Sequence, residues 1–151
     1  MPTLLSPLLP IVIAVGAIAF ALVTMYRVKQ YPRGSAKMIE ISDAIKEGSR
    51  AYLRRQNLTV AGVAVVLALL LWYFFNTPTA VGFLIGAFAS ALAGYLGMMT
   101  AVDTNSRVAE AAKNGISRAF NVAYQGGSVT GFLVAGLALL SVAVFYMAVG
   151  N

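Results

Sequence analysis

The chain has 151 residues, of which 60% are hydrophobic and only 11% charged, and its mean hydropathy is +0.81. Soluble globular domains carry about 25% charged residues, so this composition indicates an integral membrane protein. The sequence contains no cysteine and no histidine. This excludes disulfides, thiol nucleophiles, histidine metal ligands and Ser-His-Asp catalysis.

Four apolar runs without a charged residue cover residues 4–26, 58–75, 79–102 and 128–149. A helix rises about 1.5 Å per residue and needs roughly 20 residues to cross a bilayer core, so each run predicts one transmembrane helix. The runs do not alternate between apolar and polar residues, which excludes membrane β-strands. The first run lacks a preceding Lys or Arg and a cleavage site before Arg27, so we expect it to be retained rather than removed as a signal peptide. The fold class is therefore an all-α membrane protein.

The net charge of +6 is confined to two parts of the chain, because all eleven Lys and Arg residues lie in residues 27–55 and 107–118. With four transmembrane helices, these two segments are on the same side of the membrane. The positive-inside rule predicts that this side is cytoplasmic and that both termini are outside. Topology and attraction to anionic lipid headgroups explain the basic excess, so we expect the lipid bilayer as a partner and no nucleic acid.

The first basic segment predicts a cytoplasmic helical extension over residues 35–56, entered through a turn at residues 31–34. Apolar or small residues recur there at helical spacing: Met38, Ile41, Ile45, Gly48 and Tyr52. Pairs of opposite charge three residues apart are Lys37–Glu40, Asp43–Lys46 and Glu47–Arg50. Nothing interrupts the pattern before the second apolar run, so one helix is expected to cover about residues 35–75.

The second extension follows the third apolar run, where Asp103 can reach Arg107 and Arg107 can reach Glu110 within one helical turn. Asn114-Gly115 indicates a break between helices, and Gly126-Gly127 permits a bend or a close contact. We therefore expect one transmembrane module over residues 1–151. Its helices cover about residues 4–26, 35–75, 79–113 and 116–149.

Small residues recur every four positions in the last two runs, as Gly82, Gly86, Ser90 and Gly94 and as Gly127, Gly131 and Ala135. Small residues at this spacing allow close packing of membrane helices, so we expect both ladders to face neighbouring helices. The alternative is a pore or substrate path lined by small residues. No charged residue lies deep in any apolar run, where ion and proton sites usually contain one, and this favours packing.

The five carboxylates do not predict a catalytic or metal site. Asp43 and Glu47 are four residues apart, but Lys46 and Arg50 lie among them, as expected for an exposed helix face. The glycine-rich residues 124–128 lack the lysine of a phosphate-binding loop and precede a transmembrane run. We therefore assign no catalytic, cofactor-binding or metal-binding residue.

Two segments nevertheless resemble a known family. Residues 37–56, KMIEISDAIKEGSRAYLRRQ, resemble the first cytoplasmic loop of membrane-integral, ion-translocating inorganic pyrophosphatases, the H+- or Na+-pumping pyrophosphatases. Gly97-Met98, Asn105-Ser106-Arg107 and residues 123–129 are similar to that family's segment between its third and fourth helices. Val108 and Thr130 stand where the family usually has Thr and Met. The resemblance covers about residues 4–149.

The resemblance implies that this chain is the N-terminal four-helix portion of a pump of about sixteen helices, in the outer ring that braces a catalytic inner ring. Such a pump hydrolyses pyrophosphate to phosphate with an Asp-activated water and exports H+ or Na+. It requires Mg2+, and in some members K+, and forms a homodimer. Its catalytic motifs belong to later helices, so no catalytic residue carries over. The 151-residue chain is expected to bind neither cofactor and to be inactive by itself.

The resemblance also implies a multi-pass protein of the cell inner (plasma) membrane or of an acidic organelle membrane, with the remaining helices of the pump as partners. The alternative reading is a non-enzymatic four-helix scaffold or assembly module. A small four-helix exporter is a third possibility, but such a protein is expected to keep an ionisable residue within a span.

The charge distribution generates a test of orientation, because the chain has no native cysteine. Single cysteines at Ser49 and Asn114 should be reached by an impermeant thiol reagent only from the cytoplasmic side, and a cysteine at Asn76 only from outside. Labelling in intact and permeabilised cells measures the difference. Labelling of the Ser49 variant in intact cells would contradict the predicted orientation.

Overall fold

The computed structural model describes residues 5–149, with side chains from residue 8 onward. It contains four long α-helices: α1 (Leu5–Lys29), α2 (Ala36–Phe74), α3 (Thr77–Ala112) and α4 (Ile116–Val149). The described part of the chain has no β-strand, and all four helices are long and apolar enough to cross a membrane. The prediction of an all-α membrane protein with four spans is confirmed. α1 continues three residues beyond the apolar run that predicts it, and α2 runs unbroken from the polar extension into the second span.

Each connection between helices is made by residues suited to end one helix and begin the next. Gly34, between α1 and α2, has φ +91°, and Gly115, between α3 and α4, has φ +107°, a region that residues with a Cβ rarely adopt. The Asn76 side chain accepts a hydrogen bond of 2.9 Å from the backbone N–H of Thr79 and so caps α3. Ser35 caps α2 in the same way through Met38. The breaks predicted at residues 31–34 and at Asn114-Gly115 are confirmed.

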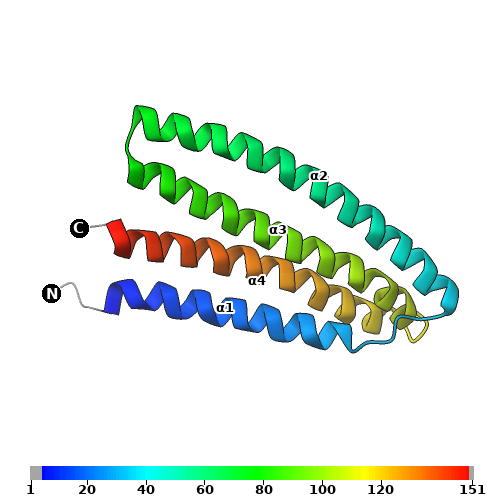
Figure 1. Ribbon diagram of the computed structural model, residues 1–151. Helices are drawn as coiled ribbons and strands as arrows, with labels where there is room; N and C mark the ends of the chain where they lie inside the picture. Colours follow the sequence, from blue (N-terminus) through cyan, green and yellow to red (C-terminus); the bar gives the residue numbers. More distant parts are fainter. Residues whose placement is uncertain (1–4, 150–151) are drawn as a thin grey trace.

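The helices form a single row in the order α1, α4, α3, α2, as Figure 1 shows. α4 packs along both α1 and α3, α2 packs against α3, and α1 has only minor contact with α3. The row is therefore an open layer and not a closed four-helix bundle. Both faces of the layer present side chains that no other helix of the described residues covers.

The buried core is small because the layer is one helix thick. Ala21 of α1 and Val129 and Leu133 of α4 are fully buried, with Met25 and Leu96 packed against them. Large apolar side chains are exposed along all four helices, among them Trp72, Tyr73, Phe74 and Phe75 at the α2–α3 connection. Lipid or other helices can cover such a surface without the penalty that water would impose.

Close helix contacts depend on small residues, but mostly not on those in the predicted ladders. Gly97 and Gly126 are buried where α3 and α4 cross, each against a threonine of the other helix, and Gly136 lies against α1. Among the predicted ladder positions, Gly82 meets Phe145. The other six are exposed, and a Cβ added at any of their four glycines would meet nothing within 4 Å. Among the helices of residues 5–149, the predicted close packing is therefore not found at these six positions.

The difference between the predicted and the buried positions has a physical cause in the sequence of α3. Ala89, Ala93 and Gly97 form a second four-residue repeat, only three positions away from Gly86, Ser90 and Gly94, and it is this second repeat that is buried. Gly86 and Ser90 instead line an open groove of about 250 Å³ between α3 and α4. The apolar stripe predicted on α2 is displaced in the same way. Ile41, Ile45 and Tyr52 are exposed, while Ser42 and Leu53 are buried.

The α3–α4 crossing generates a prediction about Gly126. A Cβ at this position would lie 2.6 Å from Thr104 Cγ2, so Gly126→Ala should destabilise the protein by about 1–3 kcal/mol through overpacking. Gly131→Ala is the matched control on the same helix, because its Cβ would enter open space. That variant should unfold at the parent temperature or above it, since Ala is a better helix former than Gly by about 1 kcal/mol.

Thermal unfolding in detergent measures both variants. The double variant Gly126→Ala, Thr104→Ser should recover part of the loss, because serine lacks the Cγ2 methyl group that the new Cβ meets. Equal unfolding temperatures for Gly126→Ala and Gly131→Ala would show that the crossing tolerates a wider separation of the helices.

Candidate functional site

The charged residues gather at one end of the helix row. This end, called the basic end below, comprises residues 27–55 and 103–118, where α1 and α3 end and α2 and α4 begin. It contains all eleven Lys and Arg residues and all five carboxylates. The two segments predicted to share one side of the membrane therefore do lie together.

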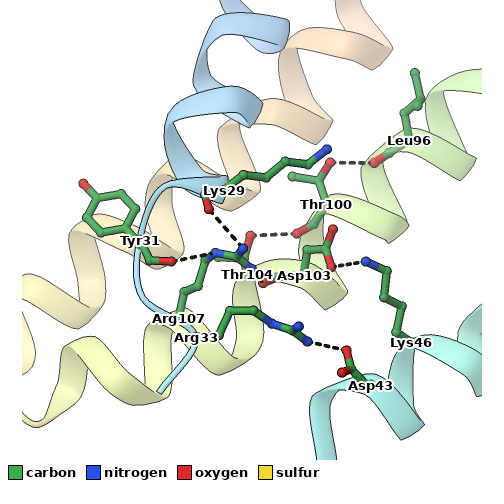
Figure 2. Close-up of polar contacts among 10 residues, drawn as sticks. All are labelled: Lys29, Tyr31, Arg33, Asp43, Lys46, Leu96, Thr100, Asp103, Thr104 and Arg107. Carbon is green, nitrogen blue, oxygen red and sulfur yellow. Dashed lines mark hydrogen bonds and ion pairs between the residues drawn. The ribbon is translucent and has the colours of Figure 1, made fainter. Parts of the chain in front are cut away.

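Arg107 of α3 is the central residue of the basic end. Its Nε donates a hydrogen bond of 3.1 Å to the carbonyl of Tyr31, and its Nη2 donates one of 3.1 Å to the carbonyl of Lys29, as Figure 2 shows. Nη1 donates to the carbonyl of Asp103 in its own helix. The last carbonyls of a helix have no partner within it. Arg107 supplies that partner at the carboxyl end of α1.

The guanidinium of Arg107 is buried, with only 7% of the residue exposed. The pKa of Arg107 is lowered, mainly because burial disfavours the charged form. The nearby Asp103 carboxylate opposes this change, and the positive charge of Arg33 adds to it. An arginine stays protonated at neutral pH in spite of such a shift, so the three hydrogen bonds are charge-assisted. The positive charge also lies at the carboxyl end of α1, where the helix dipole is negative.

Asp103 connects α3 to α2 through an ion pair. Its carboxylate lies 2.5 Å from Lys46 Nζ, and the two side chains are only 17% and 24% exposed. A pair so shielded from water is less screened than a surface pair. Arg33 and Asp43 form a second pair between the α1–α2 connection and α2. These side chains are more exposed, and such pairs contribute little.

Tyr31 joins the same junction from its other end. Its carbonyl accepts from Arg107, while its ring points away from that guanidinium in Figure 2. The Tyr31 hydroxyl accepts a hydrogen bond of 3.3 Å from Nε2 of Gln125 in α4, which also donates to Asn121. Tyr31, two residues after the end of α1, is thus held by side chains from both α3 and α4.

The buried hydroxyls of α3 are bonded within the helix. Thr104 donates to the carbonyl of Thr100, and Thr100 donates to the carbonyl of Leu96. Ser106 differs, because its buried Oγ has no hydrogen-bond partner among the described residues. The methyl group of Thr104 is therefore free to pack, and it makes the close contact with Gly126 described above.

The local ion pairs expected from sequence are only partly correct. Lys37–Glu40 forms, at 3.0 Å. The expected pair Asp43–Lys46 is wrong, because Asp43 pairs with Arg33 and Lys46 with Asp103. The expected pair between Arg107 and Glu110 is also wrong. Glu110 pairs with Lys113, and Arg107 bonds to backbone carbonyls.

The chemistry of the basic end is that of a structural junction. Four carboxylates, Glu40, Asp43, Asp103 and Glu110, are engaged by Lys or Arg. Within residues 5–149, no group of three Asp or Glu side chains lies close enough together to hold a metal ion. The arrangement joins α1, α2 and α3 and offers no convergent oxygen ligands for a hydrated cation.

Comparison with known proteins identifies the family. The family model described as inorganic H+ pyrophosphatase matches residues 15–151. The chain therefore belongs to the inorganic H+ pyrophosphatase family. The resemblance seen in residues 37–56 and 97–129 is thereby confirmed. The motif Asn105-Ser106-Arg107 contains the residue that forms the junction, Arg107. Its partners, the carbonyls of Tyr31 and Lys29, lie 76 and 78 positions earlier and could not be inferred from the motif.

Several curated relatives of this chain are named as ion pumps. A K(+)-insensitive pyrophosphate-energized proton pump 2 of Moorella thermoacetica is 45% identical over 148 residues, which are 95% of this chain and 22% of the relative. A K(+)-insensitive proton pump of Methanosarcina mazei is 46% identical over 78% of this chain and 18% of its own length. A K(+)-stimulated sodium pump of Thermotoga maritima is 42% identical over 89% of this chain and 19% of its own length. The chain spans about a fifth of these relatives.

The junction generates a prediction about Arg107. Arg107→Ala removes the donors to the Lys29 and Tyr31 carbonyls. Because a hydrogen bond to a charged group contributes roughly 1.5–3 kcal/mol, the free energy of unfolding should fall by at least about 2 kcal/mol. Arg107→Lys should be intermediate, because a single ammonium cannot reproduce the fork of the guanidinium. Arg118→Ala, which removes an exposed charge from α4, should change stability by no more than about 0.5 kcal/mol.

Denaturant titration in detergent micelles measures the three variants. A loss for Arg107→Ala as small as that for Arg118→Ala would mean that the carbonyls of α1 find other partners and that Arg107 is not a structural junction.

Proposed function

We propose that this chain supplies the N-terminal four helices of a pump that couples the hydrolysis of pyrophosphate to the translocation of H+ or Na+ across a membrane. The observation that carries the proposal is the match of residues 15–151 to the family model, together with relatives named as pyrophosphate-energized pumps. Those relatives are about five times longer than the matched segment, so the activity belongs to a larger assembly.

The residues of this chain do not fit a magnesium site, so no catalytic step is assigned to them. Four of the five carboxylates at the basic end are paired with Lys or Arg, whereas Mg2+ requires free oxygen ligands in octahedral arrangement. We propose that the Mg2+ expected for the pump is held by residues outside this chain. The relatives include K(+)-insensitive and K(+)-stimulated pumps, so a K+ requirement is proposed only as a property that varies within the family.

The role proposed for the four helices is mechanical. The open layer presents two apolar faces, which suit lipid on one side and further helices of the pump on the other. We propose that the basic end is cytoplasmic, as the positive-inside rule predicts, and that the pump is a homodimer. The membrane proposed is the cell inner (plasma) membrane or that of an acidic organelle.

A chimaera tests the proposal. This chain replaces the matching segment of the Moorella thermoacetica pump, with which it shares 45% identity. Inverted vesicles that contain the chimaera should acidify on addition of pyrophosphate and Mg2+, and a protonophore should abolish the gradient. The purified 151-residue chain should release no phosphate above background, with or without Mg2+ and K+, because residues 5–149 contain no convergent set of carboxylates.

Two results would contradict the proposal. A chimaera that reaches the membrane at the parent level but neither hydrolyses pyrophosphate nor acidifies the vesicles would favour a four-helix scaffold without a part in pumping. Hydrolysis by the isolated chain that disappears in the Asp43→Ala, Glu47→Ala double variant would show that these helices contain catalytic residues.

A further inference from the structure

The structure contains a second polar feature, a notch on the surface between α1 and α4 close to the basic end. It is an open recess of about 540 Å³, a volume within the roughly 300–1,000 Å³ of small-molecule sites. Its walls come from the last three turns of α1, the connection that follows, and the first half of α4. The junction built around Arg107 lies beside it and holds the backbone of Tyr31, one of its lining residues.

The lining of the notch changes from apolar to polar along α1. Phe20 lies at the apolar end, where its ring centroid is 4.6 Å from that of Phe132. Arg27 lies at the polar end, two turns or about 10 Å further along the helix. The apolar run of the first helix stops at Tyr26, immediately before Arg27. The notch therefore crosses the end of the apolar run, with Phe20 within that run and Arg27 just beyond it.

The polar end of the notch provides donors and a positive charge. Arg27 is exposed, and no carboxylate in residues 5–149 forms an ion pair with it. None of the residues that line the notch is acidic, while Gln30 and Tyr124 add polar groups beside the arginine. The Tyr31 hydroxyl oxygen accepts a hydrogen bond from Gln125, and the Tyr31 O–H remains able to donate a hydrogen bond to an oxygen of a ligand.

We propose that this notch binds one anionic phospholipid, with the phosphate on Arg27 and one acyl chain along Phe20 and Phe132. Charge complementarity selects an anionic headgroup over a zwitterionic one. The apolar end selects a lipid over a soluble anion, because inorganic phosphate would gain nothing from the Phe20–Phe132 contact. This site is independent of pyrophosphate hydrolysis, so its test does not depend on the proposed function.

Native mass spectrometry of the detergent-solubilised chain with added lipid tests the proposal. Phosphatidylglycerol and phosphatidylcholine with the same acyl chains are the two probes. One molecule of phosphatidylglycerol should bind more tightly than phosphatidylcholine, and Arg27→Ala should weaken it about fivefold, as expected for one basic residue near an anionic headgroup. Arg118→Ala removes an equal charge from the same end outside the notch and should leave the affinity unchanged.

A second variant tests the cavity without changing any charge. Ser128→Trp places a large ring in the notch and should weaken phosphatidylglycerol to the same extent as Arg27→Ala, whereas Arg27→Lys should retain most of the binding. Circular dichroism of each variant verifies that the helices remain folded. If Arg27→Ala does not fold, the contrast between Ser128→Trp and Arg118→Ala decides the question.

Four results would overturn the proposal. Equal losses for Arg27→Ala and Arg118→Ala would indicate diffuse attraction to the basic end, and equal binding of the two lipids would exclude headgroup selection. Competition by millimolar inorganic phosphate would assign the notch to a soluble anion. A dimer that depends on Arg27, in place of a bound lipid, would assign it to a second copy of the chain.

Discussion

One buried guanidinium, that of Arg107, ties the end of α1 to α3 at the basic end. α1 and α3 have only minor packing contact, yet Arg107 reaches from α3 to the carbonyls of Lys29 and Tyr31 and fixes the end of α1. Asp103, one turn earlier, fixes α2 through Lys46. Unsatisfied carbonyls and an unpaired buried cation would both be costly, so each stabilises the other. Two polar side chains of a single helix turn thus hold three helices together where the chain leaves the apolar region.

Elsewhere the helices are held together by close contacts at small residues. Gly97 and Gly126 allow α3 and α4 to approach within reach of threonine side chains, and Gly136 allows α4 to lie close to Ile18 of α1. Such packing suits a membrane, where lipid tails are as apolar as leucine and helices associate through close contact rather than by avoiding water. An open layer with a small core would be a poor soluble domain, but in a bilayer it leaves two broad apolar faces for lipid and for further helices.

The polar junction and the open helix layer agree with membership in the inorganic H+ pyrophosphatase family. The curated relatives named as ion pumps are about five times longer than the segment that this chain matches. The described residues contain paired charges, helix caps and packing contacts, but no convergent set of carboxylates for metal-assisted hydrolysis. The described residues form an open row of four helices whose polar end is tied together by Arg107 and Asp103. The proposed lipid site lies beside the same junction, because Tyr31 lines the notch and its carbonyl accepts a hydrogen bond from Arg107.

The sequence alone determined those features that depend on neighbouring residues. Apolar runs of sufficient length specify membrane helices, and the turn at residues 31–34, the Asn76 cap and Gly115 end or begin helices by local geometry. The family could also be recognised from the sequence, because the residues of its motifs are contiguous. The tertiary structure decided which of two small-residue repeats in α3 is buried, since three positions separate them and either could face α4. It also decided the partners of Arg107 and Lys46, because a side chain binds whatever group the fold brings near it. Those groups lie 76, 78 and 57 positions away in the chain, beyond the reach of any helical spacing rule.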